Sequence, residues 1–132
     1  MNYLLDTHAF LWAAFSPNKL SNKTRNEIRS AENQVCISIV SFWEISLKYT
    51  LGKIELSNCT PADMPDIAIQ MGFEIIQLGA QETASFYQLP KIAPKDPFDR
   101  MIIWQAIQQQ RILVSKDASF PEYRQFGLKA LW

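Results

Sequence analysis

The chain has 132 residues, 48% of them hydrophobic, and its 13 basic and 13 acidic residues give a formal net charge of zero. This length predicts a single domain over residues 1–132, which can bury a core without disulfides. The charge balance argues against a broad basic surface for gripping nucleic acid, although it allows a local contact with a phosphodiester. Two cysteines outside any CxxC pair and one histidine argue against a zinc site.

Strands and helices are predicted to alternate along the chain. In chain order they are a strand at about residues 2–5, a helix at 7–15, a polar helix at 21–32 capped by Ser21, a strand at 35–38, helices at 39–51 and 61–71, a strand at 73–77, helices at 81–89 and 97–109, and strands at 112–115 and 129–131. This order predicts a three-layer α/β/α fold around a central, mainly parallel sheet.

The predicted helix at 39–51 is apolar on two sides. Val40, Trp43, Leu47 and Leu51 form one strip at 100° per residue, Phe42, Ile45 and Tyr49 form a second, and Ser41, Glu44 and Lys48 occupy the narrow polar wedge between them. A helix that is apolar on two sides must be covered on two sides. The sheet would cover one side, and a partner subunit could cover the other.

Four acidic residues are placed where they could meet in this fold. Asp6 and Asp117 follow predicted strands, whereas Glu44 and Asp99 lie near the starts of predicted helices. In a parallel α/β sheet, the carboxyl ends of the strands and the amino ends of the following helices share the edge where ligands bind. Converging carboxylates repel one another, so a divalent cation is the expected reason for the arrangement.

Three of these acids have a structural alternative. Asp6 could cap the helix that follows it, unless Thr7 takes that role. Glu44 and Lys48 form an i, i+4 pair of the kind found on exposed helix faces, although the polar wedge that holds them is narrow. Asp117 could be a turn residue in SKDASF.

Asp96 and Asp99 are separated by their positions in DPFDR. Asp96 precedes Pro97, and Asp-Pro is a favoured cap and first position of a helix. Asp99 then lies at the third helical position, where a carboxylate interacts well with the helix dipole but is not needed as a cap. The sequence therefore predicts that Asp99 is a ligand and that Asp96 is structural.

Carboxylate oxygens without histidine or cysteine favour Mg²⁺ or Mn²⁺. Such ions activate water and neutralise the charge that develops on a phosphoryl group. Ser115 could add a hydroxyl at the same strand end. His8 could be a general base in the sequence D-T-H, but its helical position beside the apolar Ala9 and Phe10 favours its interpretation as a structural residue.

Four stretches together resemble one protein family: LLDTHAFLW, SIVSFWEISLKYTLGKIEL, DPFDRMIIWQA and ILVSKDASF. They resemble PIN-domain proteins, which are similar in fold to 5′-nuclease domains, and specifically the VapC-type toxins of bacterial toxin–antitoxin pairs. The resemblance covers nearly the whole chain. It implies a Mg²⁺-dependent endoribonuclease whose catalytic and metal-binding acids are Asp6, Glu44, Asp99 and Asp117.

The resemblance also implies partners: an RNA substrate, an antitoxin and a second copy in a homodimer. No signal peptide or membrane span is predicted, and the cysteines suit a cytoplasmic protein. Two other functions stay open. One is a catalytically silent PIN-like module that binds RNA or protein, and the other is a metal-dependent phosphohydrolase for small phosphate esters.

Overall fold

A five-stranded, wholly parallel sheet forms the centre of the molecule, which is a computed structural model describing residues 1–117 and 120–132. The strand order is β3-β2-β1-β4-β5. The strands are β1 (Asn2–Leu5), β2 (Gln34–Ser38), β3 (Glu74–Ile76), β4 (Ile112–Val114) and β5 (Lys129–Leu131). The helices are α1 (Thr7–Phe15), α2 (Asn22–Arg29), α3 (Ile39–Thr50), α4 (Met64–Gln70), α5 (Ala80–Ala84) and α6 (Pro97–Gln108).

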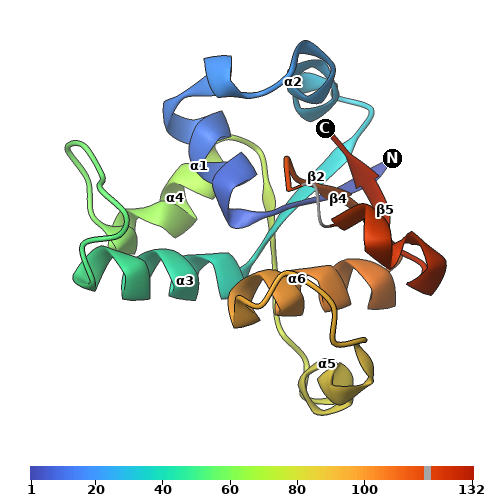
Figure 1. The fold of residues 1–132 in the computed structure, drawn as a ribbon. Coiled ribbons are helices and arrows are strands. Elements are labelled where there is room, and N and C mark those ends of the chain that lie inside the picture. Colours follow the sequence, from blue (N-terminus) through green and yellow to red (C-terminus); the bar gives the residue numbers. More distant parts are fainter. Residues whose placement is uncertain (118–119) are drawn as a thin grey trace.

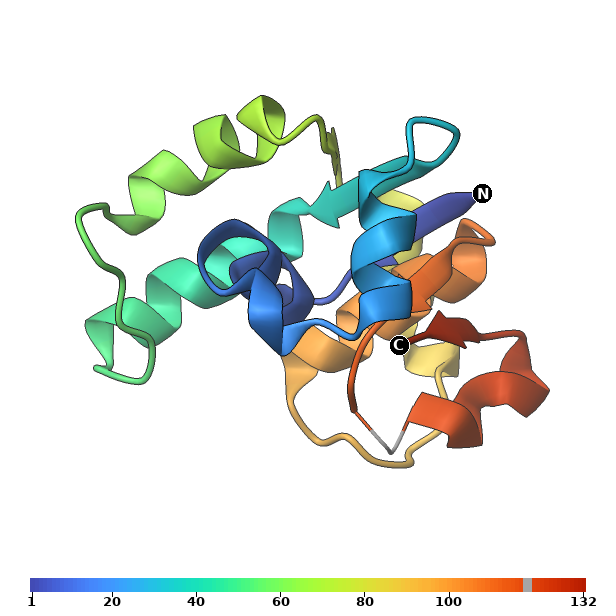
Figure 2. The same ribbon diagram turned by 90° about the horizontal axis from the view of Figure 1, so that it is seen from above.

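Helices cover both faces of the sheet, which confirms the three-layer α/β/α prediction (Figures 1 and 2). Successive residues of β1 point to opposite faces, as the pleat of a strand requires. Leu4 packs with α6 and the segment after α5, whereas Tyr3 and Leu5 pack with α1 and α4. Each face therefore has its own apolar core.

The register of the strands brings their carboxyl ends level with one another. Leu5 at the end of β1 is aligned with Ile37 of β2 and Val114 of β4. The Asp6 backbone N–H continues this ladder by donating to the Val114 carbonyl (3.1 Å). Residues that directly follow these strands therefore emerge at one edge of the sheet.

Three predicted helices are shorter than the sequence suggests. The polar helix expected at 21–32 ends at Arg29 as α2. The expected helix at 61–71 begins with a 3₁₀ turn, Pro61–Asp63, before α4. The expected helix at 81–89 ends as α5 and continues as a 3₁₀ turn, Ser85–Gln88. There the Ser85 hydroxyl donates to the Gln81 carbonyl (2.7 Å), which competes with the backbone bonds of a regular helix. The turn expected after Asp117 includes residues 118–119, which lie outside the described residues.

Most of one apolar strip of α3 is exposed in the single chain, although Val40 of that strip is buried and Tyr49 of the second strip is also exposed. Trp43 is 65% and Leu51 is 59% exposed, whereas Ile45 of the second strip is fully buried. The helix extends outward from the sheet together with the loop that follows it (Figures 1 and 2). Within the described chain, no helix combines the length and the apolar character needed to cross a membrane.

Candidate metal centre

Asp6 lies at the end of the middle strand and caps α1. Its Oδ1 accepts a hydrogen bond from the Ala9 backbone N–H (2.8 Å), and Ser115 also hydrogen bonds to this carboxylate. Burial raises the pKa of Asp6, although the hydrogen bonds from Ser115 and Ala9 oppose the rise. The prediction that Thr7 could cap in its place is wrong, because the Asp6 side chain makes the capping bond.

Glu44 is 1% exposed and points from α3 toward the start of α1. The Thr7 hydroxyl, 3.0 Å from the Ser41 hydroxyl, donates to Glu44 Oε1 at 2.5 Å. Lys48 forms an ion pair with the other oxygen of Glu44. The predicted i, i+4 pair is therefore present, but its carboxylate is buried in a polar network and does not lie on a solvated helix face.

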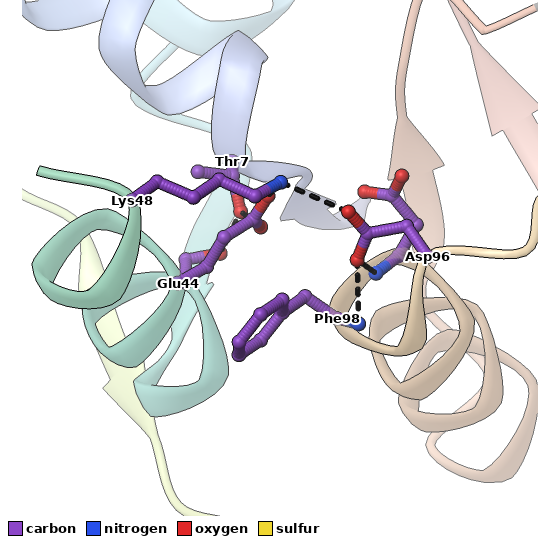
Figure 3. A network of polar contacts seen from close by, with 7 residues as sticks. Thr7, Glu44, Lys48, Asp96 and Phe98 are labelled. Atoms are coloured by element: carbon purple, nitrogen blue, oxygen red, sulfur yellow. Dashed lines mark hydrogen bonds and ion pairs between the residues drawn. The ribbon is translucent and has the colours of Figure 1, made fainter. Parts of the chain in front are cut away.

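Asp96 caps α6, as the Asp-Pro sequence predicts, but it also faces the acidic cluster. Its Oδ1 accepts hydrogen bonds from the backbone N–H groups of Phe98 (2.8 Å) and Asp99 (3.4 Å). Its Oδ2 lies 2.9 Å from Lys48 Nζ, so the lysine extends between Asp96 and Glu44 (Figure 3). The prediction that capping removes Asp96 from the site is wrong, because capping uses only one of its two oxygens.

Lys48 is held by these two acids. Burial lowers the pKa of Lys48, but its hydrogen bonds and attraction to Glu44 and Asp96 outweigh burial, so the pKa is raised overall. Burial likewise opposes the ionisation of Asp96, yet its bonds with Lys48 and Phe98 leave the pKa of Asp96 below its usual value. Lys48 therefore stays charged and neutralises part of the cluster.

The cluster converges on Asp99, in the first turn of α6. One carboxylate oxygen from each of Glu44, Asp96 and Asp99 lies within 4.8 Å of the others. Burial, and then the negative charges of Glu44, Asp96 and Asp6, raise the pKa of Asp99 to about 7. Asp99 thus lies where existing charges disfavour its own ionisation, and a bound cation would relieve that repulsion.

A cleft of about 320 Å³ opens beside these acids. Its lining consists of Asp6, His8, Trp12, Asp99, Lys116 and Asp117. Asp117 is exposed, and its backbone N–H donates to Ser115 Oγ (3.0 Å). Glu44 is absent from the described lining, since it approaches the cluster from the interior. Three of the predicted acids therefore face the cleft, and the fourth, Glu44, lies on the buried side of the cluster.

His8 lies in this cleft and is exposed, contrary to its interpretation as a structural residue. Its apolar neighbours Ala9 and Phe10 are buried on another side of α1. The helical spacing could have predicted that His8 lies on the same face as Trp12, because the two are four residues apart. Their ring centroids are 5.8 Å apart.

The donor set suits a hard divalent cation. The clustered atoms are carboxylate oxygens, which Mg²⁺ and Mn²⁺ prefer, and the cluster contains no cysteine or histidine among the described residues. The raised pKa of Asp99 is a second observation that a positive charge fits here. The fold and this centre together define a parallel α/β domain with an acidic site at the carboxyl edge of its sheet.

Comparisons with known proteins agree with this description. A sequence model of the PIN domain matches residues 3–125, so the chain belongs to the PIN domain family. Ribonuclease VapC22 of Mycobacterium tuberculosis is 25% identical to it over 129 residues, which are 98% of this chain and 97% of the relative.

Two solved structures have the same fold. A structure of VapBC2 from Rickettsia felis bound to a promoter DNA fragment matches with a TM-score of 0.70 and 22% identity, covering 100% of this chain and 99% of the other. A structure of DNA-bound VapBC from Salmonella typhimurium matches with a TM-score of 0.63 and 18% identity, covering 99% and 97%.

Proposed function

We propose that this chain is a Mg²⁺- or Mn²⁺-dependent endoribonuclease and the toxin of a toxin–antitoxin pair. The observation that carries this proposal is the convergence of buried and half-buried carboxylates on Asp99 at the ligand-binding edge of the sheet. Membership of the PIN family and the similarity to a protein named Ribonuclease VapC22 support the same conclusion.

In this proposal Asp6, Glu44 and Asp99 hold the metal, and Asp117 completes its surroundings or holds a second ion. When bound, the ion would supply an activated water and neutralise charge on the phosphodiester. The chain's own residues keep the ligands in place. Ser115 and the Ala9 N–H orient Asp6, and Thr7 and Lys48 orient Glu44. Such supporting bonds commonly matter for metal affinity.

The proposed partners are an RNA substrate, an antitoxin and a second copy of the chain. The structural relatives are VapBC assemblies, which supports a protein partner. The exposed strip that carries Trp43, Leu47 and Leu51 supports an interface, because large apolar patches at a surface mark contact sites. Free Cys36 and Cys59 suit the reducing cytoplasm, which we propose as its location.

The direct test is cleavage of RNA with Mn²⁺ and with EDTA. Wild type should cut only with Mn²⁺, and Asp6→Asn should lose most of that activity. Asp66→Asn is the matched control, because Asp66 is an exposed acid on α4. Equal cleavage by wild type and Asp6→Asn, with or without EDTA, would overturn the proposal.

A catalytically silent binding module is the second candidate, and Lys48 favours it. This lysine already bridges Glu44 and Asp96, so part of the cluster is neutralised without any metal. Binding of Mn²⁺ without cleavage across many RNAs would favour that function. Turnover of a nucleotide but not of RNA would favour a phosphohydrolase.

A further inference from the structure

Trp12 lies between two hollows of the surface. On one side it lines the acidic cleft with Asp6 and Lys116. On the other it lines a hollow of about 360 Å³ with Leu11 and Leu56. The ring is only half-buried, so core packing does not account for its position. An aromatic side chain thus lies beside the acids, at the boundary between their cleft and the neighbouring hollow.

Three side chains surround this ring. His8 lies one turn earlier on α1, and Trp132 meets the ring edge at a centroid distance of 5.6 Å and an angle of 65°. The Lys116 ammonium lies 5.9 Å from the centroid of Trp12. These contacts come from α1, from the segment after β4 and from Trp132, and they pack around the ring.

The cleft needs a source of affinity other than charge. Among the described residues, Asp6, Asp99 and Asp117 face it against a single lysine, Lys116, so a phosphodiester approaching them is repelled until a cation is bound. The net charge of the chain is zero, so long-range attraction does not offset that repulsion. Stacking of a base on an aromatic ring is the contact that binds a nucleic acid without relying on charge.

We propose that Trp12 is a nucleobase-stacking residue that positions single-stranded RNA at the acidic cleft. An unpaired base stacks beside Trp12, the adjoining phosphodiester lies at the acids, and Lys116 contacts a phosphate of the same strand. This assignment rests on the proposed ribonuclease function and deepens it by naming the residue that positions the strand at the cleft. A paired base is already stacked in its duplex. Trp12 is therefore a stacking platform that selects unpaired RNA.

Stacking is tolerant of base identity, because every base has a π face. Trp12 therefore sets the position of the strand and its single-stranded character, without selecting one base. Trp12 is a positioning residue, since the reacting phosphodiester lies at the acids.

The experiment combines a protein change with a substrate change. Wild type, Trp12→Leu and Trp12→Phe are assayed with Mn²⁺ on a single-stranded oligonucleotide, and on versions in which one base at a time is removed. Tyr87→Leu is the control for losing an aromatic ring at the surface, because Tyr87 is 80% exposed in the 3₁₀ turn after α5. Melting curves establish that each variant is folded.

At one position near the cut, removal of the base should lower kcat/KM about tenfold or more, and Trp12→Leu should cause a loss of similar size. The two losses should not multiply when combined, because both remove the same contact. Trp12→Phe should keep most of the activity, as should Tyr87→Leu. Losses that multiply at every position, or equal losses from Trp12→Phe and Trp12→Leu, would overturn the assignment.

Binding separates this assignment from the proposed activity. The dissociation constant for the same oligonucleotides is measured in an Asp99→Asn background, which is expected to stop cleavage. Weaker binding on Trp12→Leu, limited to RNA that retains the stacked base, supports the platform even if wild type cuts no RNA. Unchanged binding on Trp12→Leu, or no binding by any variant, overturns the platform, whereas absence of cleavage by wild type overturns only the ribonuclease proposal.

Discussion

The inner and outer halves of the acidic cluster use the same chemical group in different ways. The inner half is Glu44 and Asp96, whose carboxylates are bridged by Lys48. The outer half is Asp6, Asp99 and Asp117, which face the cleft. Lys48 holds the pKa of Asp96 low, whereas its effect on Asp99 is too weak to offset burial and the neighbouring acids. Glu44 and Asp96 also hold Lys48 in place, whereas Asp6 and Asp99, whose pKa values are raised, are poised for a cation.

The largest effect should separate Asp99 from its neighbour Asp96. We expect Asp99→Asn to lower kcat/KM for RNA cleavage about 100-fold or more, because it removes a ligand at the centre of the cluster. Asp96→Asn keeps a competent helix cap and should cost about tenfold or less. Kinetics at saturating Mn²⁺ measure both. Equal losses would show that the two halves do not differ in function.

Removing the lysine should leave Glu44 and Asp96 without their internal cation and so strengthen the response of the cluster to a metal ion. Lys48→Met leaves Glu44 buried without its partner, so metal-free protein should lose about 2–3 kcal/mol of unfolding free energy. Its melting temperature should then rise more on addition of Mn²⁺ than that of wild type. Denaturant and thermal unfolding measure the two quantities. Lys53→Met, at an exposed position, is the control. If the melting temperature of Lys48→Met responds to Mn²⁺ as wild type does, the proposed difference between the inner and outer halves is contradicted.

The pH dependence of the unfolding free energy should reveal the raised pKa of Asp99 in the outer half. The pKa of Asp99 is raised to about 7 in the folded state from its ordinary 3.8, so the folded protein holds a proton there that the unfolded chain has lost. The contribution of this proton is complete below about pH 4 and disappears as pH rises through 7. We expect the unfolding free energy of metal-free wild type to fall relative to Asp99→Asn across that range. Parallel curves for the two proteins would contradict the raised pKa.

The smallest effect should come from the hydroxyl that orients Glu44. Thr7→Val removes the hydrogen bond to Glu44 Oε1 and should cost about 1 kcal/mol of unfolding free energy. Thr50→Val, which loses an exposed hydroxyl bond to the Leu47 carbonyl, should cost less. Chemical denaturation of both variants measures the difference. If Thr50→Val proves the more damaging, the Thr7 bond contributes little to the inner half.

Much of the fold follows from local sequence signals. The boundaries of α1 and the Ser21 and Asp96 caps match the sequence prediction, because apolar periodicity and capping residues act over a few positions. The convergence of acids at one edge also follows, because parallel strands fix where their carboxyl ends lie.

The missed features depend on contacts between distant segments. Asp96 contributes one oxygen to its helix cap and the other to Lys48, 48 residues earlier, and a capping pattern does not indicate the second bond. Trp12 resembles one more apolar residue of α1 until Trp132 and Lys116 are placed beside it. Such pairings arise from tertiary packing and have no local signature.

The position of β1 in the middle of the sheet has a consequence for synthesis of the protein. Asp6 is made more than a hundred residues before the strand that pairs with β1 on its other side, Ile112–Val114. Asp99 and Asp117 also belong to the final third of the chain. A nascent chain on the ribosome thus lacks a complete acidic cluster until the segment that carries Asp99 and Asp117 has been made. Fragments that stop before Asp99 would therefore lack the proposed metal centre.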